Sequence, residues 1–108
     1  MSIKVSLEEL PTLIRERGEA VYVCTVSDPA VSHLSHTTAT IADGRILCGA
    51  GGMGRRNADE RPAVVLLWPS REPKDYSLIV DGIARVTADG LSIEPQSAVL
   101  HRPAGATD

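Results

Sequence analysis

A chain of 108 residues with 43% hydrophobic side chains can form one compact core but not two, so we expect a single domain over residues 1–108. Its formal net charge of -3 and its few aromatic side chains provide neither a basic surface nor a stacking platform, which argues against nucleic-acid binding. No apolar run approaches the roughly 20 residues that span a bilayer, and charged residues interrupt the N-terminal segment. We therefore expect a cytoplasmic protein without a membrane partner.

The first predicted element is a short amphipathic helix. Ser6 and Glu9 fit a capping box, and apolar residues then repeat at helical spacing as far as Gly18, which is a typical C-terminal stop. Pro11 would remove one backbone hydrogen bond from the helix, so the regular helix can also begin at Pro11, after a distorted first turn.

Six short strands are predicted next, each rich in apolar or β-branched residues and bounded by turn residues. They are Ala20–Val26, His33–Ala42, Arg45–Ala50, Ala63–Trp68, Tyr76–Thr87, and a last strand from Leu91–Ile93 on towards Ser97–His101. The dipeptide Asp43-Gly44 predicts a tight hairpin turn with Gly44 at positive φ. Gly82 predicts a bulge or bend. Ala63–Trp68 is nearly all apolar, and we interpret it as a central strand buried on both faces.

These elements predict a mainly β fold. The strands are joined mostly by hairpins, with one helix at the front and a short helix of one or two turns, within Arg55–Glu60, after the third strand. This order excludes an alternating βαβ sheet and favours a small closed or partly closed barrel of six strands.

The cysteines and histidines do not form a metal-binding pattern, and we predict no metal site. Cys24 and Cys48 lie in apolar runs without a second ligand at zinc spacing, which favours reduced, buried thiols over a disulfide. His33 and His36 are three residues apart on a predicted strand, so they point to opposite faces.

The stretch Gly49–Pro62 departs from ordinary strand and turn composition. It holds four glycines in six positions and then the pair Arg55-Arg56, a combination that suits a phosphate group. A mobile connection with solvated arginines would have the same composition. No Walker lysine follows, and Gly49-x-Gly51-x-x-Gly54 is too common a pattern to diagnose a dinucleotide fold. The residues alone leave both readings open.

The order of these motifs resembles the pyridoxamine 5'-phosphate oxidase-like family. The resemblance runs from about Leu7 to Arg102 and rests on the Asp43-Gly44 hairpin, Arg56-Asn57, Pro62-Ala-Val-Val-Leu and Val80-Asp-Gly-Ile-Ala84. It implies the flavin-binding split barrel, a homodimer, and FMN as cofactor, with the deazaflavin F420 as the alternative. A barrel this small, with a strand apolar on both faces, also leaves surface that one chain can scarcely cover.

The resemblance also implies which residues hold the cofactor. The phosphate would be held by the loop after the third strand and the following helix start: Gly51, Gly52, Arg55, Arg56 and Asn57. Ser35, Thr37 and Thr38 lie on the strand that passes beside the isoalloxazine ring in the family, although threonine is also simply a good strand residue. Family members often carry a lysine three residues before the asparagine, where this chain has Gly54.

No catalytic side chain is identified, and none is required, because a flavin or deazaflavin carries the hydride chemistry itself. One hypothesis is an FMN- or F420-dependent oxidoreductase that transfers hydride to an unidentified small molecule. The alternative is a non-catalytic homodimer that binds or sequesters a flavin or deazaflavin. A third hypothesis is a purely structural dimer.

Overall fold

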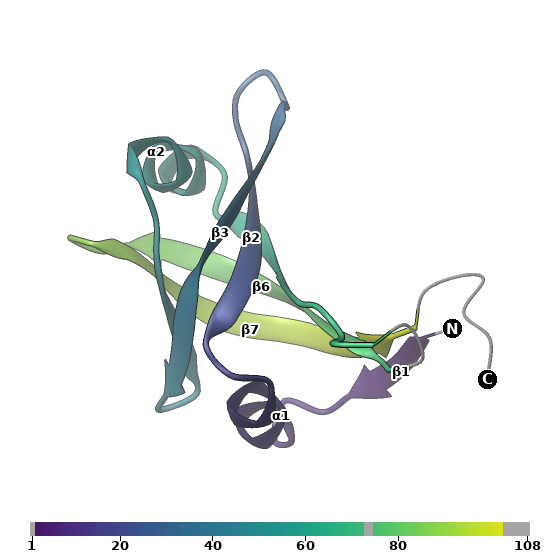
Figure 1. Ribbon diagram of the computed structural model, residues 1–108. Coiled ribbons are helices and arrows are strands. Elements are labelled where there is room, and N and C mark those ends of the chain that lie inside the picture. The colour runs from purple at the N-terminus through teal and green to yellow at the C-terminus, as the bar shows by residue number, and fades with distance from the viewer. Residues whose placement is uncertain (1, 73–74, 103–108) are drawn as a thin grey trace.

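The computed structural model describes residues 2–72 and 75–102, and its strands form a closed antiparallel barrel (Figure 1). The elements are β1 (Ser2–Val5), α1 (Leu10–Arg17), β2 (Ala20–Val26), β3 (Ser32–Ala42), β4 (Arg45–Gly49), α2 (Gly52–Glu60), β5 (Ala63–Trp68), β6 (Ser77–Val86) and β7 (Gly90–His101). The strand order is β1-β7-β4-β3-β2-β5-β6, and an additional β6–β7 pairing closes a ring of six strands. The predicted mainly β class with a six-stranded barrel and two helices is confirmed.

The two helices lie at opposite ends of the barrel in Figure 1, with α2 at the top and α1 at the bottom. Helix α1 packs against β3 through its buried residues Leu10 and Ile14, whereas α2 contacts β2, β6 and β7. This arrangement leaves the N-terminus of α2 at the surface, directly after β4. None of the described helices is long and apolar enough to cross a membrane.

The core follows the alternation of strand residues, with one face of each strand directed into the barrel. Trp68 is only 1% exposed, and its indole Nε1 donates a hydrogen bond to the Gly18 carbonyl oxygen at 3.2 Å. The prediction that Ala63–Trp68 is buried on both faces is wrong. Val64 and Leu66 face the core, while Val65 remains 37% exposed, because a closed barrel has an outer face that no second layer covers.

The predicted turns of the β3–β4 hairpin and the β6 bulge are confirmed. Ala42 pairs with Arg45, so the loop has two residues, and both have positive φ, 53° at Asp43 and 75° at Gly44. The pairing of β6 with β7 shifts register between Asp81 and Gly82. A Cβ on Gly82 would overlap the Ile93 side chain, which explains why glycine occupies this bulge.

The N-terminal segment differs from its prediction in two ways. Strand β1 was not predicted, and it pairs antiparallel with the end of β7. The Ser6 hydroxyl accepts a hydrogen bond from the Glu9 amide at 3.3 Å, as in a capping box, but that bond closes a turn that precedes the helix. Helix α1 itself begins at Leu10 with Pro11 in its first turn and ends before Gly18, whose φ is 85°.

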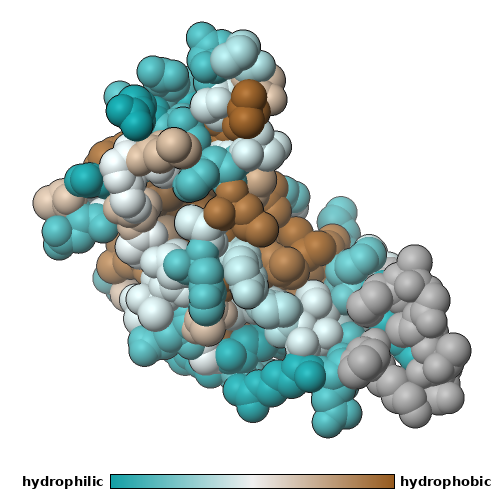
Figure 2. Space-filling view, turned by 45° about the horizontal axis from the view of Figure 1, so that its top comes forward, coloured by the Kyte–Doolittle hydropathy of each residue, from teal (hydrophilic) through white to brown (hydrophobic). Residues whose placement is uncertain are grey.

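Apolar side chains also gather on the outside of the barrel, and a hydrophobic patch surrounded by polar residues is visible on the face shown in Figure 2. The strand register places Leu34, Cys24 and Val65 in one row across β3, β2 and β5. A second row contains His36, Tyr22, Leu67 and Ile79. We call these two rows the outer face.

Candidate functional site

The N-terminus of α2 is open to solvent and lacks a cap. Gly51 is the N-cap residue in extended backbone geometry, no side chain bonds to the first turn, and that turn contains no acidic residue. In the described chain, no group accepts a hydrogen bond from the amides of Gly52, Met53 or Gly54. Unpaired amides and the positive end of the helix dipole make such a terminus attractive to an anion.

The two adjacent arginines have different surroundings. Arg55 is half-buried, and its Nη1 donates a hydrogen bond to the Ala88 carbonyl oxygen at 2.8 Å, which ties α2 to the turn between β6 and β7. The Nε of Arg55 is buried without a hydrogen-bond partner. Arg56 is exposed and makes no hydrogen bond or ion pair within the described residues. Arg56 can therefore turn to a ligand at no cost to the fold.

Asn57 lies inside the protein rather than at the open end of the helix. Its side chain is only 4% exposed, and Nδ2 donates a hydrogen bond to the Thr25 hydroxyl at 3.2 Å. The amide thus joins α2 to β2. Gly54 is also buried, and a Cβ there would lie 3.5 Å from the Ala50 Cβ, an ordinary contact. The backbone therefore does not force a glycine at this position.

The predicted hydroxyl residues of β3 are divided between the two faces of the strand. Ser35 and Thr37 pair with the buried valines of β2, on the side directed into the barrel, and Thr38 points outward. A Cβ on Gly49 would lie 2.9 Å from the Thr37 hydroxyl oxygen, so Thr37 lies close to the segment that leads into α2. The structure thus brings Thr37 near the glycine-rich stretch on the inner face of β3 and places Thr38 on the outer face of the same strand.

Thr38 lines a surface groove beside that segment, which we call the 87–90 groove. Its volume is about 370 Å³, and its lining includes Thr40, Leu47, Thr87 and Asp89. The Ala50 amide donates a hydrogen bond to the Asp89 carbonyl oxygen at 3.3 Å, so the groove adjoins the start of α2. A Cβ on Gly90 would overlap the Cys48 carbonyl oxygen, which fixes this close approach.

Thr87 and Asp89 were not predicted as site residues. The dipeptide Asp89-Gly90 signals a turn in the sequence, but nothing local indicates that this turn lies against the strand end before α2. The turn at Asp89-Gly90 and the end of β4 are about forty residues apart in the sequence. They come together because β4 pairs with β7 in the barrel.

The remaining candidates have structural roles. His36 stacks on Tyr22 with ring centroids 4.8 Å apart, and His33 pairs with Thr25 on the opposite face of β3. Both cysteines are free thiols, and burial raises the pKa of Cys48 to about 11. Among the described residues, no group of three acidic, cysteine or histidine side chains could hold a metal ion.

Comparison with known sequences identifies relatives of this chain. No protein-family model matches the chain, so the resemblance to the pyridoxamine 5'-phosphate oxidase-like family is not confirmed. An uncharacterized protein of Mycobacterium bovis and one of Mycobacterium tuberculosis are each 35% identical, over 94% of this chain and 82% of theirs. A phosphate acyltransferase of Ruegeria is 28% identical, over 79% of this chain but 23% of its own length.

One solved structure shares the architecture. An FAD binding protein from Mycobacterium smegmatis superposes with a TM-score of 0.67 and covers 94% of this chain and 100% of its own. The two sequences are 16% identical, so the likeness shows a common fold. The predicted kind of fold, a small barrel found in flavin-binding proteins, is thereby supported.

Proposed function

The chain belongs to the same family as the two mycobacterial proteins, and we propose that it is a flavin-binding protein whose cofactor phosphate lies at the N-terminus of α2. The observation that carries this proposal is the uncapped first turn of α2, whose amides have no acceptor within the described residues, on the same helix as the exposed Arg56, which has no partner there either. The barrel shared with an FAD binding protein supports the same class of ligand.

The residues present fit a phosphate-bearing cofactor. The amides of Gly52 and Met53 and the side chain of Arg56 would bind phosphate oxygens through charge-assisted hydrogen bonds. Arg55 has a buried Nε without a partner and could contribute a further donor. Asp89 lies nearby and opposes a negative charge, so Asp89→Asn should strengthen binding. The hydroxyls of the 87–90 groove would receive the uncharged polar part of the cofactor.

For activity, we propose an oxidoreductase that uses FMN or F420. A bound flavin or deazaflavin supplies hydride transfer, and the chain would bind it, orient it and shield one of its faces from water. The second candidate is binding or sequestration without turnover. It would use the same terminus of α2 and the same 87–90 groove, and because the cofactor itself carries the hydride chemistry, a turnover measurement separates the two candidates.

We further propose that the protein acts as a homodimer. The outer face exposes Leu34 and Val65 next to Tyr22 and Leu67, and a second copy would cover this apolar surface. A cofactor site formed by the surface of one barrel would then be bordered by the other subunit.

The test is calorimetric titration of the purified protein with FMN, FAD and F420, preceded by a visible absorbance spectrum. We expect one of them to bind in the micromolar range or tighter, and inorganic phosphate to compete. If none binds, the proposal is wrong. If one binds without competition from phosphate and without loss in Arg56→Ala, the cofactor site lies elsewhere. Stopped-flow oxidation of the reduced complex then separates an oxidoreductase from a binding protein.

A further inference from the structure

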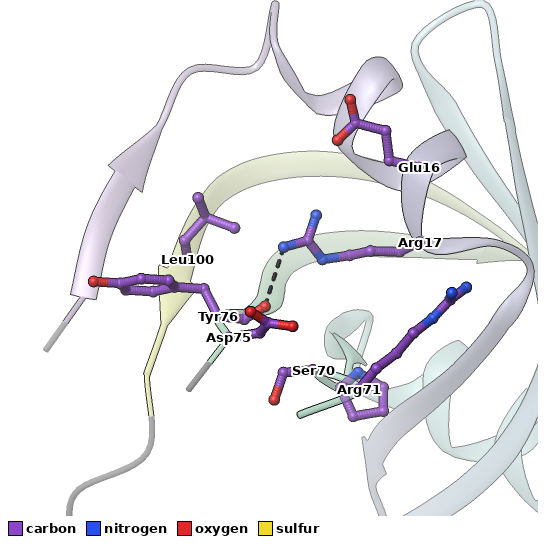
Figure 3. A pocket seen from close by; sticks show the side chains of 8 residues that line it. Glu16, Arg17, Ser70, Arg71, Asp75, Tyr76 and Leu100 are labelled. Carbon is purple, nitrogen blue, oxygen red and sulfur yellow. Dashed lines mark hydrogen bonds between the residues drawn. The ribbon is translucent and has the colours of Figure 1, made fainter. Parts of the chain in front are cut away.

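A second pocket lies at the opposite end of the barrel from α2, where the end of α1, the β5–β6 connection and the end of β7 meet (Figure 3). Its volume is about 360 Å³, which is within the range of small-molecule sites, roughly 300 to 1,000 Å³. Four charged side chains of both signs line it: Glu16, Arg17, Arg71 and Asp75. We call it the α1 pocket. None of its residues belongs to the flavin site.

Arg17 is held in position before any ligand arrives. It is half-buried, and its guanidinium donates hydrogen bonds to the Tyr76 carbonyl oxygen at 3.1 Å and to the Leu13 carbonyl oxygen at 3.4 Å. Figure 3 shows the side chain reaching from α1 towards Tyr76. A guanidinium carries five N–H groups, so donors remain for a ligand. Since the side chain is already ordered, a ligand that binds it loses little additional conformational entropy.

The walls around Arg17 are also fixed by backbone contacts. The Ser70 amide donates a hydrogen bond to the Ser77 hydroxyl at 3.0 Å, and the Asp75 amide donates one to the Glu72 carbonyl oxygen at 3.0 Å. These contacts fix the two ends of the β5–β6 connection that face the pocket. Arg71 and Asp75 are exposed side chains on these ends.

The four charges do not neutralise one another. Among the described residues, none of these four side chains takes part in an ion pair. Arg17 and Arg71 can thus donate hydrogen bonds to a carboxylate, while Asp75 can accept them from an ammonium group. Charge complementarity of both signs within one small pocket favours a zwitterion over an anion or a cation.

We propose that the α1 pocket binds a small zwitterion of the α-amino acid class. The ligand carboxylate bonds to Arg17 and Arg71, and its ammonium group bonds to Asp75. This site is separate from the proposed flavin site, and the two can be occupied independently.

The test uses two-dimensional amide NMR on the whole protein, titrated with a pool of the common α-amino acids and then with its single active member. We expect shift changes concentrated at residues 16–17, 69–71 and 75–76. Acetate and methylamine, which each carry one of the two charges, should bind at least about tenfold more weakly, because acetate lacks the contact to Asp75 and methylamine lacks those to Arg17 and Arg71.

Variants of the two exposed pocket residues test the proposed contacts with the carboxylate and the ammonium group. Arg71→Gln and Asp75→Asn should each weaken binding of the amino acid about tenfold, since each removes one charge and keeps a polar side chain. Arg85→Gln, an exposed arginine of β6 that does not line the pocket, should bind as wild type. The proposal is overturned if no amino acid shifts these amides, if acetate or methylamine binds equally well, or if both variants bind unchanged.

Discussion

At the scale of single residues, the adjacent arginines Arg55 and Arg56 have different roles. Arg55 donates to the Ala88 carbonyl oxygen and is half-buried, so its first role is to hold the β6–β7 turn against α2. Arg56 has no such contact within the described chain. A guanidinium without internal partners is free to form bidentate bonds with a phosphate.

Replacing Arg56 by alanine should therefore weaken flavin binding without destabilising the fold. A charge-assisted bond is worth roughly 1.5 to 3 kcal/mol, so the dissociation constant should rise by about one to two orders of magnitude. Arg55→Ala should weaken binding as well, but it should also lower the melting temperature. Calorimetry and thermal unfolding measure the two effects, with Arg85→Ala as the matched control. Equal affinities of wild type and Arg56→Ala would contradict the assignment.

The two thiols should differ in reactivity. Burial disfavours the thiolate of Cys48 and raises its pKa from 9.0 to about 11, whereas Cys24 is half-buried on β2. Because the thiolate is the nucleophile, iodoacetamide at pH 8 should modify Cys24 well before Cys48 in protein diluted until the subunits separate, since Cys24 lies on the outer face that the dimer would cover. Peptide mapping after timed quenching measures both rates.

The same shift makes stability depend on pH. Above about pH 9 the unfolded thiol of Cys48 ionises while the folded one stays protonated, so the unfolded state binds fewer protons and stability falls as pH rises towards 11. Cys48→Ser should reduce this loss of stability at high pH.

In the alkylation experiment, a Cys48 that reacts as fast as Cys24 in the folded protein would show that its site is open.

At the scale of elements, the β3–β4 turn depends on one glycine. Gly44 has φ of 75°, a region in which a β-branched side chain is strained. We expect Gly44→Val to lower the free energy of unfolding by about 1 to 2 kcal/mol. Gly52→Ala is the control, because that backbone is not in the positive region and a Cβ there meets no atom within 4 Å. Urea titrations giving the same loss for both variants would refute the strain argument.

Helix α2 is anchored by a buried amide as well as by Arg55. Asn57→Ala removes the hydrogen bond to Thr25 and leaves that hydroxyl buried, so we expect a loss of about 1 to 3 kcal/mol in urea unfolding. Asp59→Ala, an exposed change on the same helix, should stay within about 0.5 kcal/mol of wild type. An Asn57 variant as stable as wild type would mean that this contact does not anchor α2.

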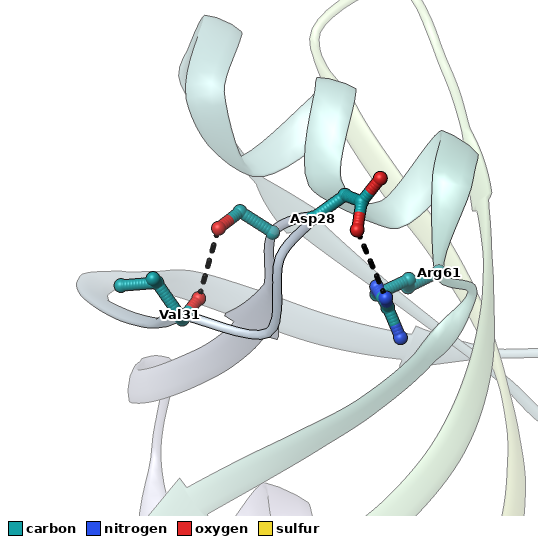
Figure 4. Close-up of polar contacts among 4 residues, drawn as sticks. Asp28, Val31 and Arg61 are labelled. Carbon is teal, nitrogen blue, oxygen red and sulfur yellow. Dashed lines mark hydrogen bonds and ion pairs between the residues drawn. The ribbon is translucent and has the colours of Figure 1, made fainter.

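A surface ion pair adds little to this anchoring. Arg61 Nη2 lies 3.3 Å from Asp28 Oδ1 and links the end of α2 to the β2–β3 loop (Figure 4). Both side chains are largely exposed, so we expect a contribution between about 0 and 1 kcal/mol. The buried hydrogen bond of Asn57 and the bond of Arg55 to Ala88 therefore position α2.

Local sequence predicted most of the elements, because strand ends coincide with strong turn residues. The dipeptide Asp43-Gly44 and the proline after Trp68 set three strand ends to within a residue. Strand β1 was missed because Ser2–Val5 is short and pairs with the far end of the chain. The inward position of Asn57 depends on Thr25, 32 residues away, which no local pattern encodes. The glycine-rich stretch was compatible with an anion site and with a mobile connection, and nothing in it predicted that Arg55 and Arg56 would differ.

At the scale of the whole molecule, closure of the barrel decides which apolar residues stay exposed. A strand in the middle of a layered fold is covered on both sides, whereas a barrel strand has an outer face that only another molecule can cover. On the outer face, Leu34 is 63% exposed and Val65 is 37% exposed, and both belong to the row that Cys24 joins. Isolated exposed apolar residues are common on protein surfaces, but here the exposed Leu34 and Val65 adjoin the half-buried Tyr22, Leu67 and Ile79, which is the pattern expected of an interface.

We therefore expect a homodimer that buries the outer face. Light scattering at micromolar concentration should give twice the monomer mass of 11.5 kDa. Leu34→Lys and Val65→Lys place a charge in the interface, which is costly to bury without a partner, so both should shift the mass towards that of the monomer. Because the side chains of Leu34 and Val65 are exposed in the single chain, the circular dichroism spectra of both variants should match that of wild type. Ile3→Lys, an exposed apolar residue on β1 outside the two rows, should remain dimeric. A wild-type monomer, or a dimer that survives both lysine variants, would mean that these rows do not form the contact.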